Sequence, residues 1–170
     1  GDGSVKAWMD GTELYIGGYG KIIAGSSLVY AFRTGGKINS ITGFEMLDTS
    51  NVTDMSQMFQ SCGNHSTEFT LDLGNNFNTS NVIRMKDMFY GCGRESTKFT
   101  LNLGDNFDTS NVYDMSGLFH NCGYNSTVLA LDLGEKFDTS NVINMSDMFN
   151  GCGSKSTVFT LDLGEKFDTS

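Results

Sequence analysis

A tripeptide with the sequence Asp/Asn-Thr-Ser recurs every 30 residues along most of this 170-residue chain. It begins at residue 48 and returns at residues 78, 108, 138 and 168 with no insertion or deletion. A fixed period of about 20–50 residues is typical of solenoids, whose units bury their apolar faces only by stacking on one another. The period therefore predicts four 30-residue repeats and the start of a fifth over residues 48–170, behind an N-terminal cap formed by residues 1–47.

The first half of each unit has the apolar spacing of a helix. Ser50 is suited to cap the start of such a helix, because its hydroxyl can accept an unpaired backbone N–H. Gly63 can take the left-handed conformation that often follows a helix end. The apolar residues between them, which would share one helical face, are Val52, Met55, Met58, Phe59 and Cys62.

The second half of each unit predicts a strand. Residues 69–73 alternate apolar and polar side chains, and residues 99–103, 129–133 and 159–163 repeat the pattern. The chain is thus expected to form a leucine-rich-repeat-like α/β solenoid, a right-handed stack of strand-turn-helix units. Helices pack about 8–10 Å apart and strands about 4.8 Å apart, so the sheet should line a concave side.

Residues 1–47 do not contain the full unit and are expected to form the cap. Residues 13–16 and 21–24 have strand character and are joined by a glycine-rich turn, which predicts a β-hairpin. Leu28 and Phe32 then match Met55 and Phe59 of the first full unit, as expected of a shortened, degenerate repeat.

Two segments carry a family resemblance. The sequences WMDGTELYI at residues 8–16 and DTSNVTDMSQMF at residues 48–59 resemble those of the BspA-like leucine-rich-repeat bacterial surface proteins. The second pattern recurs four times, and the resemblance covers residues 8–170. It implies secretion to the surface or wall of a bacterial cell, a role in adhesion, and no catalytic residues.

The candidate binding surface is a polar strip on the exposed face of the expected sheet. Outward side chains of parallel strands repeat at a fixed spacing, so a polar or basic ligand would meet several equivalent groups. The alternative is a solvated face that only maintains solubility. The strip consists of Thr70, Asp72, Thr100, Asn102, Asp132, Thr160 and Asp162.

The cysteines of the repeats fall at one helical position, Cys62 in the first unit and Cys92, Cys122 and Cys152 in the others. A disulfide needs Cα atoms within about 7 Å, and neighbouring helices lie farther apart. A zinc site needs closely spaced ligands, which a 30-residue interval does not supply. The cysteines are therefore expected to be reduced and buried.

Other polar motifs give weaker signals. The segments 105–108 and 135–138 contain carboxylates of the kind that calcium prefers, but Lys136 enters the second, and an Asx turn explains the aspartates equally well. His65 and His120 occupy different repeat positions without a fixed nucleophile or acid beside them. No catalytic residue, metal or cofactor is expected.

The net charge of −9 disfavours partners with phosphate backbones or anionic lipid headgroups. No apolar run reaches the roughly 18–20 residues of a membrane span. The leading functional hypothesis is an adhesin that binds an extracellular protein or glycan, with a structural spacer as the alternative. Tyr90, Tyr113 and Tyr124 are expected to form an outward aromatic patch that favours binding, and an uncapped C-terminal end would permit end-to-end self-association.

Overall fold

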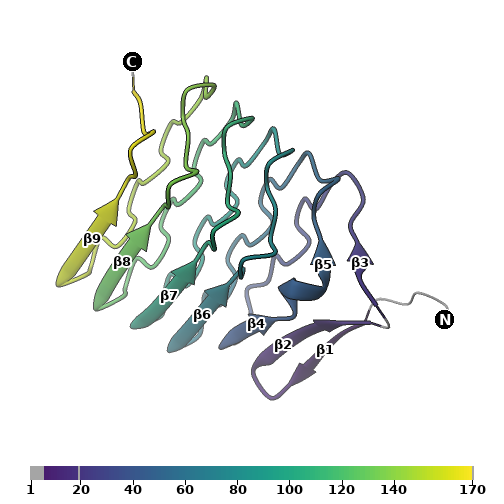
Figure 1. Cartoon of the computed structure of the whole chain (residues 1–170). Coiled ribbons are helices and arrows are strands. Elements are labelled where there is room, and N and C mark those ends of the chain that lie inside the picture. Colours follow the sequence, from purple (N-terminus) through teal and green to yellow (C-terminus); the bar gives the residue numbers. More distant parts are fainter. Residues whose placement is uncertain (1–5, 19, 170) are drawn as a thin grey trace.

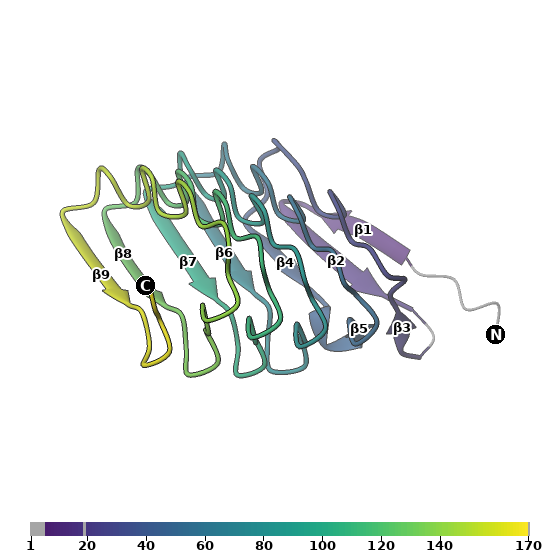
Figure 2. The same cartoon turned by 90° about the horizontal axis from the view of Figure 1, so that it is seen from above.

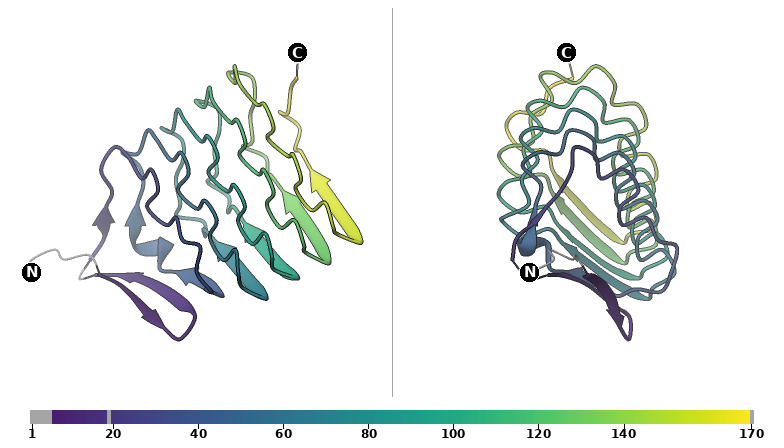
Figure 3. Two further views of the ribbon diagram at one scale, coloured as in Figure 1. Left: turned by 180° about the vertical axis from the view of Figure 1, so that it is seen from behind. Right: turned by 90° about the vertical axis from the view of Figure 1, so that its right-hand side faces the viewer.

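The computed structural model describes residues 6–18 and 20–169, which form a β-solenoid (Figure 1). The right-hand view of Figure 3 looks along the stack and shows successive coils around one interior. The expected α/β architecture is wrong, because the described residues contain no α-helix and only one 3₁₀ turn, η1 (Phe44–Met46). No helix in this part of the chain has the length and apolarity to cross a bilayer.

Most of the strands lie along one wall of the stack (Figure 2). Each full repeat contributes one five-residue strand, and the N-terminal region contributes five shorter or equal ones. In chain order the strands are β1 (Lys6–Asp10), β2 (Glu13–Gly17), β3 (Ile22–Ile23), β4 (Ser40–Thr42), β5 (Leu47–Asp48), β6 (Glu68–Asp72), β7 (Lys98–Asn102), β8 (Val128–Asp132) and β9 (Val158–Asp162).

The main sheet has the order β1-β2-β4-β6-β7, and β8 and β9 form a separate pair. Strands of the full repeats pair in parallel with a shift of one repeat, so that Phe69 lies opposite Phe99 and Leu129 opposite Phe159. The predicted parallel pairing of consecutive repeats is confirmed for these strands. Equivalent positions of the sequence therefore form columns along the stack.

The segment expected to be helical hydrogen-bonds to the next coil instead of to itself. The amides of Met55, Gln57 and Phe59 each donate to a carbonyl of the following repeat, at N–O distances of 2.8–3.0 Å. In an α-helix they would donate to the carbonyl four residues earlier. Gln57 and Ser61 have left-handed backbone, with φ of 58° and 59°, which a right-handed helix cannot contain.

The other repeats place residues suited to this conformation at the same two columns. Glycine, asparagine and aspartate adopt positive φ more readily than other residues. Short turns between the left-handed positions bring an apolar residue inward every three or four residues, as a helix would. The residues with positive φ in these columns are Asp87, Gly91, Gly117, Asn121, Asp147 and Gly151.

The interior is filled by the apolar columns that the sequence pattern placed inward. Val52, Met55, Met58 and Phe59 are fully buried, so their inward assignment is confirmed. The ring of Phe89 lies between those of Phe59 and Phe119, with ring centroids 5.6 and 5.5 Å apart and the rings nearly parallel. Aromatic pairs of this kind add about 0.5–1.5 kcal/mol to the effect of burial.

The Asp/Asn-Thr-Ser tripeptide closes a corner between coils. The buried hydroxyl of Thr49 donates to the carbonyl of Asn78, at 2.7 Å, and accepts the Asn78 amide, at 3.0 Å. Asp48 accepts the amide of Ser50 at 3.0 Å in an Asx turn. The prediction of Ser50 as a helix cap is therefore wrong, and the tripeptide instead satisfies backbone groups that a corner would leave unpaired.

The N-terminal hairpin uses other residues than expected. It is formed by β1 and β2, with a tight turn at Gly11 (φ 59°) and Trp8 opposite Tyr15. Residues 21–24 contribute β3, which pairs in parallel with β5 rather than with residues 13–16. Tyr19, in the expected turn, lies outside the described residues.

The degenerate unit stacks on the first full repeat. The amide of Leu28 donates to the carbonyl of Asp54 at 2.9 Å. The ring of Phe32 is stacked on Phe59 at a centroid distance of 5.5 Å, which extends the phenylalanine column toward the N-terminus.

Two glycines with left-handed backbone differ in the space around them, so their substitution distinguishes the cost of backbone strain from the cost of a steric clash. Gly93 (φ 58°) and Gly74 (φ 66°) are both left-handed, but a Cβ on Gly93 would lie 2.4 Å from the Phe99 ring, whereas nothing lies within 4 Å of one on Gly74.

We expect Gly74→Ala to lower the free energy of unfolding by about 1–2 kcal/mol through strain alone. Gly93→Ala should cost about 1–3 kcal/mol more, because the ring must move. Urea titration of both variants measures this, and equal losses would contradict the packing of Phe99.

Candidate functional site

All residues of the predicted strip lie on the exposed face of β6–β9. Thr70 lies beside Thr100, Asp72 beside Asn102, and Asp132 beside Asp162 in the sheet register. Thr160 lies beside Ala130, which interrupts the hydroxyl column. The sequence therefore placed these side chains on the correct face, and the structure groups them in two rows across the strands.

The acidic row also has a local structural role. Asp72, Asp132 and Asp162 each accept the amide of the glycine two residues later, at 2.9–3.0 Å. Asn102 makes the same bond at 3.1 Å, and its amide group also donates to Asp72 at 3.0 Å. An Asx turn at the end of every strand thus accounts for the repeated Asp or Asn, and asparagine serves this turn as well as aspartate does.

The sheet is interrupted between β7 and β8. There the amide of Phe99 donates to the side-chain hydroxyl of Ser126, at 3.3 Å. A groove of about 1210 Å³ begins beside this break, at Leu101 and Leu103, and extends over the C-terminal ends of the strands. We call it the seam groove.

The seam groove carries an excess of negative charge. Three residues of the predicted strip, Asn102, Asp132 and Asp162, line it, whereas the threonines of the strip do not. Five acidic and two basic side chains face it, and of these only Asp132 and Asp162 belong to the strip predicted from the sequence. The charged residues of the groove are Asp105, Asp132, Glu135, Lys136, Asp162, Glu165 and Lys166.

The calcium interpretation of residues 105–108 and 135–138 gains no support from the geometry. The ammonium group of Lys136 donates to Asn106 Oδ1 at 2.8 Å and so occupies one of the oxygens. Asp108 and Asp138 accept the amides of Ser110 and Ser140 in Asx turns, both at 2.9 Å. Within residues 6–18 and 20–169, no three His, Cys, Asp or Glu side chains are grouped to hold a metal ion.

The predicted concave shape of the strip loses its physical basis. Concavity was expected because helices on the far side would need more room than strands. Both sides of a coil instead hydrogen-bond to their neighbours, since an isolated bridge joins Asp54 to Arg84 while β6 pairs with β7. Hydrogen-bonded neighbours share a spacing of about 4.8 Å, so no such mismatch bends the stack.

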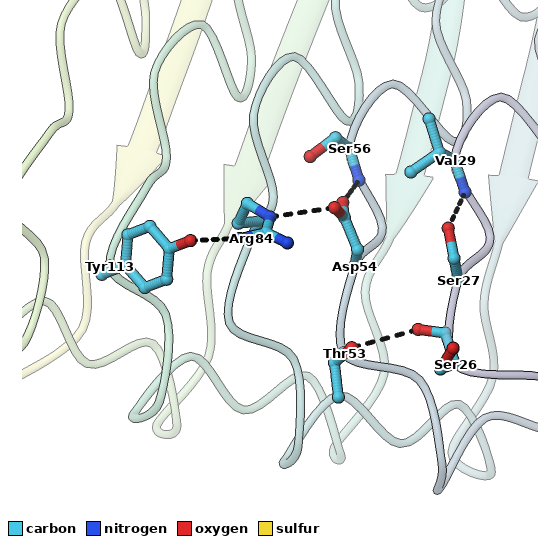
Figure 4. Close-up of polar contacts among 8 residues, drawn as sticks. All are labelled: Ser26, Ser27, Val29, Thr53, Asp54, Ser56, Arg84 and Tyr113. Atoms are coloured by element: carbon cyan, nitrogen blue, oxygen red, sulfur yellow. Dashed lines mark hydrogen bonds and ion pairs between the residues drawn. The ribbon is translucent and has the colours of Figure 1, made fainter.

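Polar side chains on the wall away from β6–β9 are tied together across coils (Figure 4). Arg84 donates to Asp54 at 2.9 Å and to the hydroxyl of Tyr113, whose ring it also covers at 5.8 Å from the centroid. Thr53 donates to the carbonyl of Ser26 at 3.2 Å. The contacts of Arg84 link three successive coils, and the bond from Thr53 joins the degenerate unit to them.

The expected tyrosine patch does not form. Tyr113 packs with Arg84, Tyr90 packs with His120 at a centroid distance of 4.8 Å, and Tyr124 lies under Arg94 at 5.4 Å. Each ring therefore belongs to a separate pair. The other histidine, His65, is 2.8 Å from a carboxylate oxygen of Glu95.

The four cysteines are unpaired and buried, as predicted, but for a different reason. The prediction assumed that packed helices keep the cysteines apart. Successive cysteines instead lie on adjacent hydrogen-bonded coils, since the amide of Gly93 donates to the carbonyl of Cys62 at 2.8 Å. Burial raises the pKa of the Cys62 thiol to about 12, which suppresses its reactive thiolate form.

Thiol labelling tests this burial. We expect no labelling of the folded protein by a maleimide and labelling of four thiols after unfolding without reductant, because only the unfolded chain exposes them. Fewer than four labels in the unfolded, unreduced sample would reveal a disulfide between adjacent coils and contradict the assignment.

Comparison with known proteins gives one match. Residues 26–160 match a family model described as "Mycoplasma protein of unknown function, DUF285". The match covers the degenerate unit and nearly all of the repeats. No curated protein and no solved structure shows significant similarity to the chain.

Proposed function

The chain belongs to the DUF285 family, and we propose that it is a non-enzymatic interaction protein of the bacterial cell surface. It binds an extracellular protein or glycan through the strip and the adjoining seam groove. The observation that carries this proposal is the groove itself, in which acidic side chains outnumber basic ones beside a break in the sheet. Such a surface favours basic or hydroxyl-rich partners.

The repeat supplies several equivalent contacts to one ligand. Asp132 and Asp162 lie directly opposite each other, with Glu135 and Glu165 in the turns that follow. Contacts that repeat from coil to coil, about 4.8 Å apart, suit an extended partner and gain affinity through multivalency. Binding that depends on these charges weakens as salt concentration rises.

The sequence is the basis for including secretion and attachment to the cell surface in the proposal. The segments at residues 8–16 and 48–59 resemble the BspA-like leucine-rich-repeat surface proteins, whose role is adhesion. A spacer that projects other domains is the second candidate. The Asx turns favour the spacer, because they account for the acidic row by local structure without a ligand.

The distinguishing variant is Asp132→Asn combined with Asp162→Asn. It removes two charges from the groove but keeps the Asx turns, because Asn102 already makes the same bond in its own repeat. A ligand is first identified on arrays of glycans and extracellular proteins with the whole chain. The double variant should then bind about tenfold or more weakly at low salt, given that a charge-assisted contact contributes about 1.5 kcal/mol or more.

Glu45→Gln combined with Asp147→Asn is the matched control, since it removes two charges from residues that do not line the groove. The control should bind like the unmodified chain. Equal binding by both double variants, with unfolding midpoints unchanged, would show that the binding site lies outside the seam groove. No ligand on any array would favour the spacer.

A further inference from the structure

The N-terminal hairpin exposes a pair of aromatic rings. Trp8 on β1 and Tyr15 on β2 are directly opposite each other and stack with ring centroids 5.5 Å apart and an interplanar angle of 12°. Trp8 keeps 49% of its surface exposed, although it is the only tryptophan of the chain. One edge of its ring lies over Gly17, whose Cβ would be 3.0 Å away. Covering this glycine explains where the ring lies but leaves much of it in water.

Two carboxylates lie on the same face of the hairpin. Asp10 and Glu13 are exposed and directly opposite each other, and alternation along the strands puts them on the side of Trp8 and Tyr15. The Tyr15 hydroxyl donates to Glu13 at 2.5 Å, and this carboxylate raises the pKa of Tyr15. Like charges directly opposite in a sheet are destabilising. Among the side chains that the structure describes, which leave out Lys6, no Lys, Arg or His forms an ion pair with either carboxylate.

The chain uses arginine to cover aromatic rings elsewhere. Its three arginines each lie over a tyrosine: Arg33 over Tyr30 at 5.2 Å, Arg84 over Tyr113 at 5.8 Å and Arg94 over Tyr124 at 5.4 Å. Arg84 also pairs with the carboxylate of Asp54. A guanidinium group combines both contacts because it is planar, always charged and able to form paired hydrogen bonds to a carboxylate.

The hairpin offers the same combination of an exposed ring and carboxylates. Among the side chains that the structure describes, which do not include that of Lys6, no Lys or Arg lies over Trp8. We propose that Trp8, Tyr15, Asp10 and Glu13, called here the hairpin platform, form the docking site for an arginine side chain of a partner polypeptide. The guanidinium group stacks on the exposed Trp8 ring and its N–H groups donate to the two carboxylates.

The hairpin platform is continuous with the exposed sheet face. Tyr15 lies opposite Thr42 on β4, and β4 pairs with β6, which carries Thr70 and Asp72. The proposal therefore deepens the proposed function, on which it rests, by naming the chemistry of one contact. The charge of the platform favours this occupant. Two carboxylates side by side attract a cation, disfavour anionic ligands, and gain less from a neutral sugar.

The first experiment uses the unmodified chain and the fluorescence of Trp8. A peptide of alternating arginine and glycine is titrated against the same peptide with citrulline, which keeps the shape of arginine but lacks its charge. We expect a saturable change in Trp8 emission with the arginine peptide and none with the citrulline peptide. A response to both peptides or to neither would overturn the proposal, as would a response only to neutral chito-oligosaccharides.

The second experiment compares variants by the fluorescence anisotropy of the labelled arginine peptide. Glu13→Gln and Glu45→Gln remove the same charge, one inside the platform and one at an exposed residue that lies in neither the platform nor the seam groove. Glu13→Gln should weaken binding about five- to tenfold and Glu45→Gln less than twofold. Trp8→Leu should weaken binding to a similar extent as Glu13→Gln, while Trp8→Phe retains a ring and most of the affinity.

Equal effects of Glu13→Gln and Glu45→Gln would show that the peptide responds only to net charge, and the platform would be abandoned. Asp132→Asn with Asp162→Asn separates the two proposals. If only this double variant lost the peptide, the platform would fail and the seam groove would stand. If only the Glu13 and Trp8 variants lost it, the platform would stand and the seam groove would fail as the site for the arginine peptide.

Discussion

Hydrogen bonds between the backbones of successive coils determine the rest of this structure. They occur on the strand wall, as between β6 and β7, and on the opposite wall, where Phe59 donates to the carbonyl of Met88 at 2.9 Å. Because neighbouring coils must stay in register on all sides, a single inserted residue would break the pairing of a whole coil. This requirement explains why the 30-residue period is kept without variation over the repeats.

Stacking in register has opposite consequences for different columns. Identical apolar or hydroxyl side chains stabilise the stack, because the phenylalanine rings pack on one another and Thr49 hydrogen-bonds to the next coil. Identical charges repel, so surface columns vary: Arg84 lies between Asp54 and Asp114 in one column. The two surfaces that we propose for binding lie where the regular stacking is interrupted or ends, at the break between β7 and β8 and at the hairpin.

The sequence predicted the period, the strands and the inward side chains, because those depend on spacing alone. It could not distinguish a helix from a series of short turns, since both bring Met55, Met58 and Phe59 to one side. The signal that would have done so is the column of Gln57, which holds Asp, Gly and Asp in the other repeats and has positive φ throughout. The hairpin was misplaced because residues 21–24 also have strand character, yet they pair with β5.

The candidate site was predictable in part for the same reason. Alternation along the strand correctly placed Asp132 and Asp162 outward. The seam groove was not predictable, since it begins where the Ser126 hydroxyl replaces a backbone partner of Phe99, a choice that no repeat pattern indicates.

Amide hydrogen exchange followed by NMR tests the central claim most directly. The amides of Phe59, Phe89 and Phe119 each donate to the next coil, at 2.8–2.9 Å. They should be as strongly protected as the strand amides of Leu71 and Leu131, which lie in the paired strands β6–β7 and β8–β9, because both sets open only when coils separate. Rapid exchange at the three phenylalanines, or helical chemical shifts over residues 50–63, would contradict a solenoid held together by hydrogen bonds between coils.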